Sequence, residues 1–178
     1  MLVSAYVPLV DRCGQPDMKG YLRRAEPLLE LDVPKKIFMP RNCIEMCRSQ
    51  CSPSTHLIPF ELTDIPPVDP EWALPVQRNV HKDVPEYLQM TLHKTKWMSE
   101  AARSRREGDP EHLIWVDFGL FHVFNDKDRF QAALRSVIRA PVPCNVVRVA
   151  GIWPVGSQGL DYANVWRDGQ QRGLWYMA

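Results

Sequence analysis

The stretch HLIWVDFGLFHV, residues 112–123, places one carboxylate, that of Asp117, inside an otherwise apolar run. A short continuous apolar run of this kind is typical of a strand buried on both faces of a parallel sheet, so we expect a strand over residues 112–118. A charged carboxylate in such surroundings costs several kcal/mol unless a cation or hydrogen-bond donors meet it. The fold and the function therefore both depend on what neutralises Asp117.

Strand-like and helix-like segments alternate on both sides of this run. Apolar, β-prone runs predict strands over residues 2–7, 35–40, 55–60, 112–118 and 144–153. Apolar residues spaced by three and four predict helices over residues 17–34, with an interruption near Pro27, and over 42–51, 84–105 and 126–141. The proline-rich segment 62–75 holds neither element and is expected to cross the surface.

This alternation predicts an α/β fold with a mostly parallel sheet that helices cover on both faces. A chain of 178 residues fits one domain over 1–178, with an α/β core over 1–153 and an aromatic-rich tail over 154–178. In the helix over 126–141, five apolar residues are expected on one side, namely Phe130, Ala133, Leu134, Val137 and Ile138.

Composition and motifs exclude several classes of function. The 22 basic residues nearly cancel the 21 acidic ones, so no overall basic field favours nucleic acid. We find no signal peptide and no apolar run long enough for a membrane span, so a cytoplasmic protein is expected. Gly-x-Ser-x-Gly and His-Glu-x-x-His signatures are absent, and no phosphate-binding Gly-rich loop supports a kinase interpretation of the DFG tripeptide at 117–119.

Lys94 is the candidate partner of Asp117. It occupies the expected core-facing stripe of its helix, formed by Met90, Lys94, Trp97 and Ala101. We therefore expect Lys94 to reach toward Asp117 or toward an anionic ligand beside it. Two alternatives remain open: Asp117 caps a loop or pairs with an arginine, and the long stem of Lys94 extends to solvent.

Three cysteines, Cys43, Cys47 and Cys51, share one helical face, and His56 follows five residues later. This spacing raises a metal site as an alternative. Structural zinc sites show tighter pairs, however, and buried cysteine behaves as a small hydrophobe. We therefore favour a stripe of free thiols that faces the core.

Three segments carry a resemblance to a known family. VSAYVPLVDR at 3–12, HKTKWMSEA at 93–101 and IWVDFG at 114–119 resemble, in order and spacing, the HtrL/YibB and WlaTC group of bacterial glycosyltransferase-like proteins. The resemblance implies a Rossmann-like GT-A fold, truncated here at its C-terminus because the chain ends at Ala178. It also implies a nucleotide-sugar donor, a glycan or small-molecule acceptor and a divalent cation, Mg²⁺ or Mn²⁺.

The resemblance also implies roles for particular residues. Asp117 would hold the metal and, with Gly119, contact the donor, while Lys94 and Arg12 would offset the charge of the diphosphate. Lys96 is the alternative to Lys94. Tyr6 would stack on the base of the nucleotide, although a core position for this tyrosine is the alternative.

The sequence departs from the GT-A pattern in its acidic motif, and a rival function also stays open. Gly119 stands where many GT-A enzymes carry a second acid, although Asn125, Asp126 and Asp128 follow. No catalytic base is assigned, and Asp161 and Asp168 are the only acids of the tail considered for it. The rival is a non-catalytic binding or assembly module, with a homodimer as one form, whose interface uses Trp153, Trp166, Trp175 and Tyr176.

Overall fold

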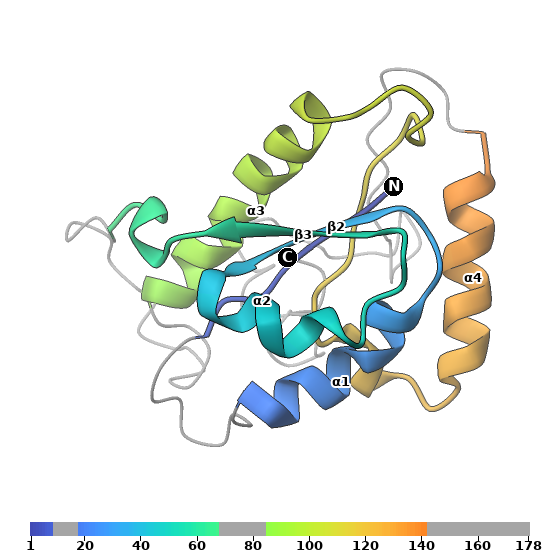
Figure 1. The fold of residues 1–178 in the computed structure, drawn as a ribbon, viewed down its shortest axis with the longest axis horizontal. Coiled ribbons are helices and arrows are strands. Elements are labelled where there is room, and N and C mark those ends of the chain that lie inside the picture. Colours follow the sequence, from blue (N-terminus) through green and yellow to red (C-terminus); the bar gives the residue numbers. More distant parts are fainter. Residues whose placement is uncertain (9–17, 68–84, 142–178) are drawn as a thin grey trace, which may run out of the picture.

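A four-stranded parallel sheet lies at the centre of the computed structural model, which describes residues 1–8, 18–67 and 85–141 (Figure 1). Its spatial order is β3-β2-β1-β4, and all three pairings are parallel. The strands are β1 (Leu2–Ala5), β2 (Lys35–Pro40), β3 (Thr55–Phe60) and β4 (Ile114–Trp115). The predicted α/β class with a parallel sheet is therefore confirmed.

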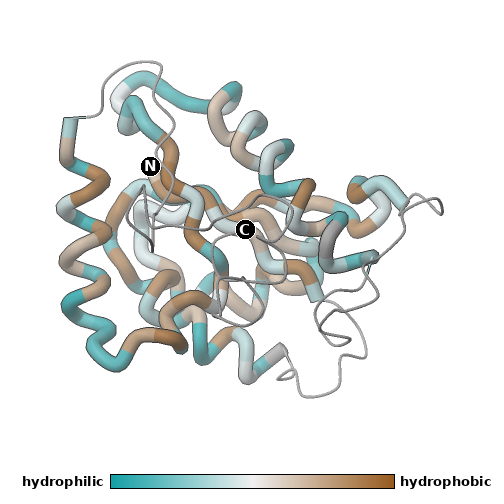
Figure 2. Tube along the Cα trace, turned by 180° about the vertical axis from the view of Figure 1, so that it is seen from behind, coloured by the Kyte–Doolittle hydropathy of each residue, from teal (hydrophilic) through white to brown (hydrophobic). Residues whose placement is uncertain are grey.

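Helices cover both faces of this sheet (Figure 1). They are α1 (Met18–Glu30), α2 (Arg41–Arg48), α3 (Pro85–Arg103) and α4 (Lys127–Arg139), with single 3₁₀ turns η1 (Leu62–Asp64) and η2 (Leu120–Val123). Helices α1, α2 and α4 share one core cluster with Leu2, Ile37 and Met39. Helix α3 packs on the other face, where Trp97 and Ala101 meet Val3 and Phe38. Helix α4, at the left of Figure 2, alternates hydrophilic and hydrophobic residues, as a helix with one buried side must.

The predicted strands agree with the structure best at the centre of the sheet. Strands 35–40 and 55–60 have the predicted bounds, whereas the first strand ends at Ala5. The strand expected over 112–118 is only Ile114–Trp115, because the chain leaves the sheet after Val116 donates to the Val3 carbonyl at 2.9 Å. The strand expected over 144–153 lies outside the described residues.

Three local expectations are wrong. Helix α1 is continuous through Pro27, which lies near its C-terminal end and removes only one hydrogen bond there. In the proline-rich segment, Leu62–Asp64 forms a 3₁₀ turn that begins before the first proline. In α4, Ala133 and Val137 are exposed, so the buried side is narrower than predicted and consists of Leu134 and Ile138, with Phe130 partly buried.

Candidate functional site

The order of the strands marks one place on the sheet as a ligand site. From β1 the chain adds β2 and β3 on one side, and β4 then pairs with the opposite side of β1. In open α/β sheets, ligands bind at such a switch point, outside the carboxyl ends of the strands. Asp117 lies two residues beyond the end of β4 and therefore at this edge.

In the part of the chain that the structure describes, two side chains contact the Asp117 carboxylate. The ammonium of Lys94, from α3, lies 2.9 Å from Asp117 Oδ1. The indole Nε1–H of Trp115 donates to the same oxygen at 2.7 Å. Lys94 Nζ also lies 5.6 Å from the centre of the Trp115 ring. The expectation that Lys94 reaches toward Asp117 is therefore confirmed. Within residues 1–8, 18–67 and 85–141, neither an arginine nor a main-chain amide contacts this carboxylate.

The carboxylate is paired but not sealed. Both contacts use Oδ1, and no hydrogen bond or ion pair reaches Oδ2 from the described part of the chain. The Asp117 side chain is 39% exposed, whereas that of Lys94 is 14% exposed. Among the described residues, Oδ2 thus keeps lone pairs that can accept from a ligand.

Tyr6 and Gly119 lie near this edge in different surroundings. Tyr6 is 4% exposed, and its ring packs against those of Tyr21 and Phe118, with centroids 5.7 and 5.2 Å away. This is the core position considered for Tyr6. Gly119 precedes η2 with φ of −95°, and a Cβ there would lie 3.5 Å from the Tyr21 ring, an ordinary contact. Roles in donor binding for both residues stay predictions.

Other predicted residues lie elsewhere or are not described. Lys96 is exposed on α3, and Lys94, not Lys96, pairs with Asp117. Arg12, the tail acids Asp161 and Asp168, and the four tail aromatics Trp153, Trp166, Trp175 and Tyr176 lie outside the described residues.

The side chains near this edge show whether acidic residues gather there to hold the predicted divalent metal. Within residues 1–8, 18–67 and 85–141, no three His, Cys, Asp or Glu side chains gather to hold an ion. Asp126 instead caps α4 by accepting from the Arg129 amide at 2.8 Å, and Asp128 is exposed in the first turn of that helix. Binding of a divalent metal at Asp117 therefore stays a prediction. Asp117 Oδ2 does fit one ligand of a Mg²⁺ or Mn²⁺ that arrives with a diphosphate, because Mg²⁺ is often held by one carboxylate and substrate phosphates.

The three thiols belong to the core, as favoured from the sequence. Cys43 and Cys47 are fully buried on α2, and Cys51 packs partly against the same cluster. Burial raises the pKa of the Cys47 thiol to about 12. His56 is exposed and pairs in register with Lys36, on the α3 face of the sheet, so it does not join the thiols.

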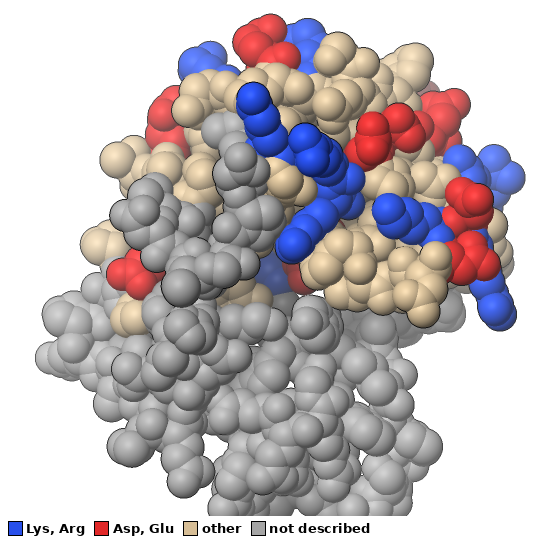
Figure 3. All heavy atoms as spheres, turned by 90° about the horizontal axis from the view of Figure 1, so that it is seen from below, with Lys and Arg blue, Asp and Glu red and all other residues tan. Residues whose placement is uncertain are grey.

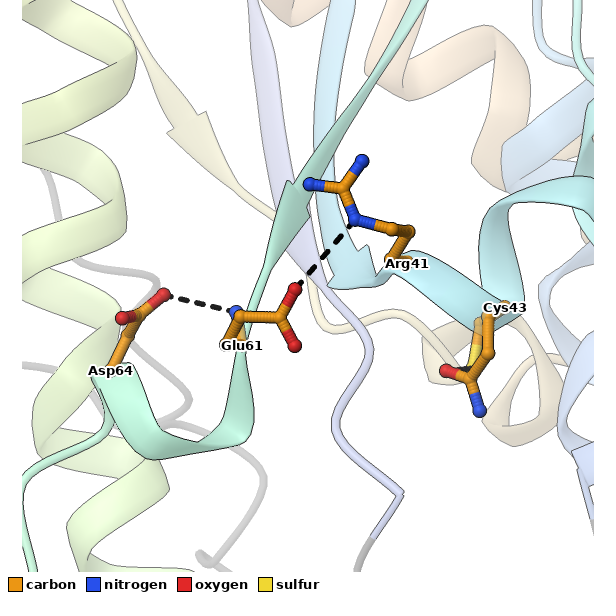
Figure 4. Close-up of polar contacts among 5 residues, drawn as sticks. Arg41, Cys43, Glu61 and Asp64 are labelled. Atoms are coloured by element: carbon orange, nitrogen blue, oxygen red, sulfur yellow. Dashed lines mark hydrogen bonds and ion pairs between the residues drawn. The ribbon is translucent and has the colours of Figure 1, made fainter.

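A cavity that we did not predict lies at the carboxyl ends of β2 and β3. Its volume is about 540 Å³, and its lining consists of Pro40, Arg41, Asn42, Glu61, Leu62 and Thr63. Figure 4 shows Arg41 and Glu61 pointing toward each other from the two strand ends, with Nε and Oε1 3.7 Å apart. The sequence signal that could have indicated this cavity is that a charged residue directly follows both β2 and β3, namely Arg41 and Glu61.

Charge on the surface is mixed. In Figure 3, Lys and Arg side chains gather near the middle of the visible face, and Asp and Glu side chains flank them. This distribution agrees with the formal net charge of +1 and provides no single-sign surface there. No helix in the described ranges combines the length and the apolar character that crossing a membrane requires.

Comparison of the chain with family models, with curated proteins and with solved structures gives no match. The fold and site thus define an α/β protein with a parallel sheet and a partly exposed carboxylate, paired with a lysine, at its switch point.

Proposed function

We propose that this chain is a glycosyltransferase-like protein that binds a nucleotide-sugar at the sheet edge formed by the carboxyl ends of β1 and β4. One observation carries the proposal: at the switch point, Asp117 is partly exposed, pairs with the ammonium of Lys94, and has an Oδ2 that no described residue contacts. The proposed reaction is transfer of the sugar to a glycan or small-molecule acceptor.

The strand order supports the nucleotide part of this proposal. The order 3-2-1-4 matches the first four positions of the 3-2-1-4-5-6 order of doubly wound nucleotide-binding folds. In such folds the phosphates lie at the carboxyl edge of the sheet. A Rossmann-like fold of the GT-A type, in which further sheet follows β4, is part of the same proposal.

The chemistry of the two side chains supports the sugar and phosphate part. An ionised carboxylate only accepts hydrogen bonds, so Oδ2 suits a ribose or sugar hydroxyl, or a cation carried by the diphosphate. An ammonium beside it offsets negative charge that develops on a diphosphate leaving group. The proposal does not require a resident metal.

A thermal-shift experiment tests this proposal. The wild-type protein is heated with UDP-glucose, UDP-N-acetylglucosamine or GDP-mannose, each with and without Mn²⁺. At a donor concentration about 100 times Kd, binding stabilises by about 2.7 kcal/mol, so Tm should rise by about 5 °C or more. The rise should fall by about half or more in Asp117→Asn, which keeps the shape of the side chain and removes its charge.

The matched control is Asp128→Asn, which makes the same change of charge on an exposed carboxylate of α4. It should respond to the donor as the wild type does. If no donor shifts Tm and the protein forms a concentration-dependent dimer, the assembly module replaces the transferase. Equal loss in both variants would also contradict a specific role for Asp117.

A further inference from the structure

Trp115 is held rigidly on the α3 face of the sheet. Its ring stacks on that of Trp97, with centroids 6.1 Å apart and planes 9° from parallel. Trp97 is 2% exposed and is itself enclosed by the rings of Phe38, Phe60 and His93, at 6.1, 5.4 and 4.7 Å. Because aromatic side chains in such a packed cluster have few alternative rotamers, the direction of the indole N–H is set by the core.

Asp117, in contrast, lies beyond the regular strand. The last bond between β1 and β4 runs from the Val116 amide to the Val3 carbonyl, and the Asp117 main-chain oxygen accepts from the Leu120 amide in the turn that follows. The sheet therefore does not fix the carboxylate. Its orientation depends on the side chains that contact it, namely Trp115 and Lys94.

These two contacts differ in stiffness. Lys94 reaches Oδ1 through a flexible four-carbon stem, which loses rotamer freedom when it is ordered. The indole of Trp115 is short, planar and already packed, and it donates to Oδ1 at 2.7 Å while its ring lies 5.6 Å from the Lys94 ammonium. The attraction of the cation to the aromatic face adds to the ion pair.

We propose that Trp115 is a positioning residue of the site: it fixes Asp117 Oδ1 and Lys94 together, so that Oδ2 alone is presented to the ligand. Asp117 then contacts the nucleotide-sugar through one oxygen, whether the group it meets is a hydroxyl or a cation carried by the diphosphate. This inference rests on the proposed function, because it assigns how the same site holds its donor.

The test separates positioning from simple structural support by a double-mutant cycle. Trp115→Phe keeps a ring on Trp97 and removes the N–H. Donor affinity is measured by calorimetry with UDP-glucose, UDP-N-acetylglucosamine and GDP-mannose in wild type, Trp115→Phe, Asp117→Ala and the double variant. Circular dichroism and the melting temperature show that each variant folds.

We expect Trp115→Phe to weaken donor binding about tenfold, the size of one charge-assisted hydrogen bond. The same substitution should have no effect on binding when Asp117 is already alanine, because the tryptophan then has nothing to orient. An unchanged affinity in Trp115→Phe overturns the inference while the proposed function stands. An equal loss in both backgrounds shows structural support only and also overturns it.

A second measurement needs no ligand. In ¹⁵N-labelled protein, the indole resonance that disappears in Trp115→Phe should shift and exchange faster with solvent in Asp117→Ala. If the chemical shift and the solvent-exchange rate of this indole resonance are unchanged in Asp117→Ala, the inference is overturned. Absence of binding to every donor by the wild type overturns the proposed function, and this inference with it, even where the resonance shows that the indole bond exists.

Discussion

Lys35 and Lys36 are neighbours in the chain, yet they bind the C-terminal ends of two helices on opposite faces of the sheet. The Lys35 ammonium donates to the Leu31 carbonyl, directly after α1, and to Ser52 Oγ at 2.9 Å. The Lys36 ammonium donates to the Ala101 and Ser104 carbonyls at the end of α3, at 3.2 and 2.7 Å. Successive side chains of a strand point to opposite faces, so two adjacent lysines serve both layers.

The two edges of the sheet therefore carry charged residues with different roles. Both helices run antiparallel to the strands, so their negative C-terminal ends meet the lysines at the start of β2. The opposite, carboxyl edge carries the Lys94–Asp117 pair and the Arg41–Glu61 pair. The buried lysines therefore belong to the stability of the fold, and Lys94 belongs to the candidate site.

Lys36→Met should destabilise the protein by about 2 kcal/mol, because the carbonyls of Ala101 and Ser104 lose a charged donor. Urea unfolding measures the difference. Lys96→Met is the matched control, since Lys96 is exposed on the same helix. Equal urea midpoints for Lys36→Met and wild type would contradict this prediction. They would show that water can satisfy the carbonyls of Ala101 and Ser104 without a loss of stability.

Lys35 should make stability depend on alkaline pH. Burial lowers the pKa of Lys35 from 10.5 to about 8, so between these values the unfolded chain binds a proton that the native chain has lost. Stability from this group therefore rises as pH goes from 8 to 10.5, by up to about 3 kcal/mol. Below pH 8 both states are protonated, and the contribution is constant.

The three thiols act in the opposite direction, because burial raises the pKa values of Cys43, Cys47 and Cys51. The measurement is therefore the difference in unfolding free energy between wild type and Lys35→Met at each pH. This difference should move in favour of the wild type above pH 8. A difference that stays constant up to pH 10.5 would contradict the lowered pKa.

Trp97→Ala should cost about 3 to 5 kcal/mol, since the indole is 2% exposed and contacts four aromatic rings on the α3 face. Leu92→Ala removes a side chain that is 57% exposed on the same helix and should change stability by less than about 0.5 kcal/mol. Chemical denaturation of the two variants gives the comparison. A small effect of Trp97→Ala would mean that α3 is not held by this cluster.

Cys47 should resist alkylation in the native protein. Its thiol is fully buried with a pKa raised to about 12, so very little thiolate exists at pH 8. Iodoacetamide labelling followed by peptide mass spectrometry should modify Cys47 only after unfolding in urea. Cys51, which is partly exposed, should be modified earlier. Rapid native labelling of Cys47 would contradict the core-facing position of α2.

Local pattern was sufficient for most elements. The bounds of β2 and β3 follow from apolar, β-prone runs, and α3 follows from its periodicity and its flanking prolines. The narrow buried side of α4 was not predictable, because Ala133 and Val137 are apolar but meet no neighbouring layer. The short β4 was not predictable either, since an apolar run does not reveal where pairing with β1 stops.

For the site, the sequence by itself determined that Lys94, on an apolar helical face, and Asp117, after a strand, each needed a partner. The reason is that an isolated charge is not stable in an apolar layer. Only the tertiary structure decided that they meet each other. The parallel pairing of β4 with β1 brings Asp117 under α3, and the indole of Trp115 joins Lys94 at one oxygen. The carboxylate is partly exposed where the chain leaves the sheet, and this exposure follows from packing, which the spacing of residues in the sequence does not reveal.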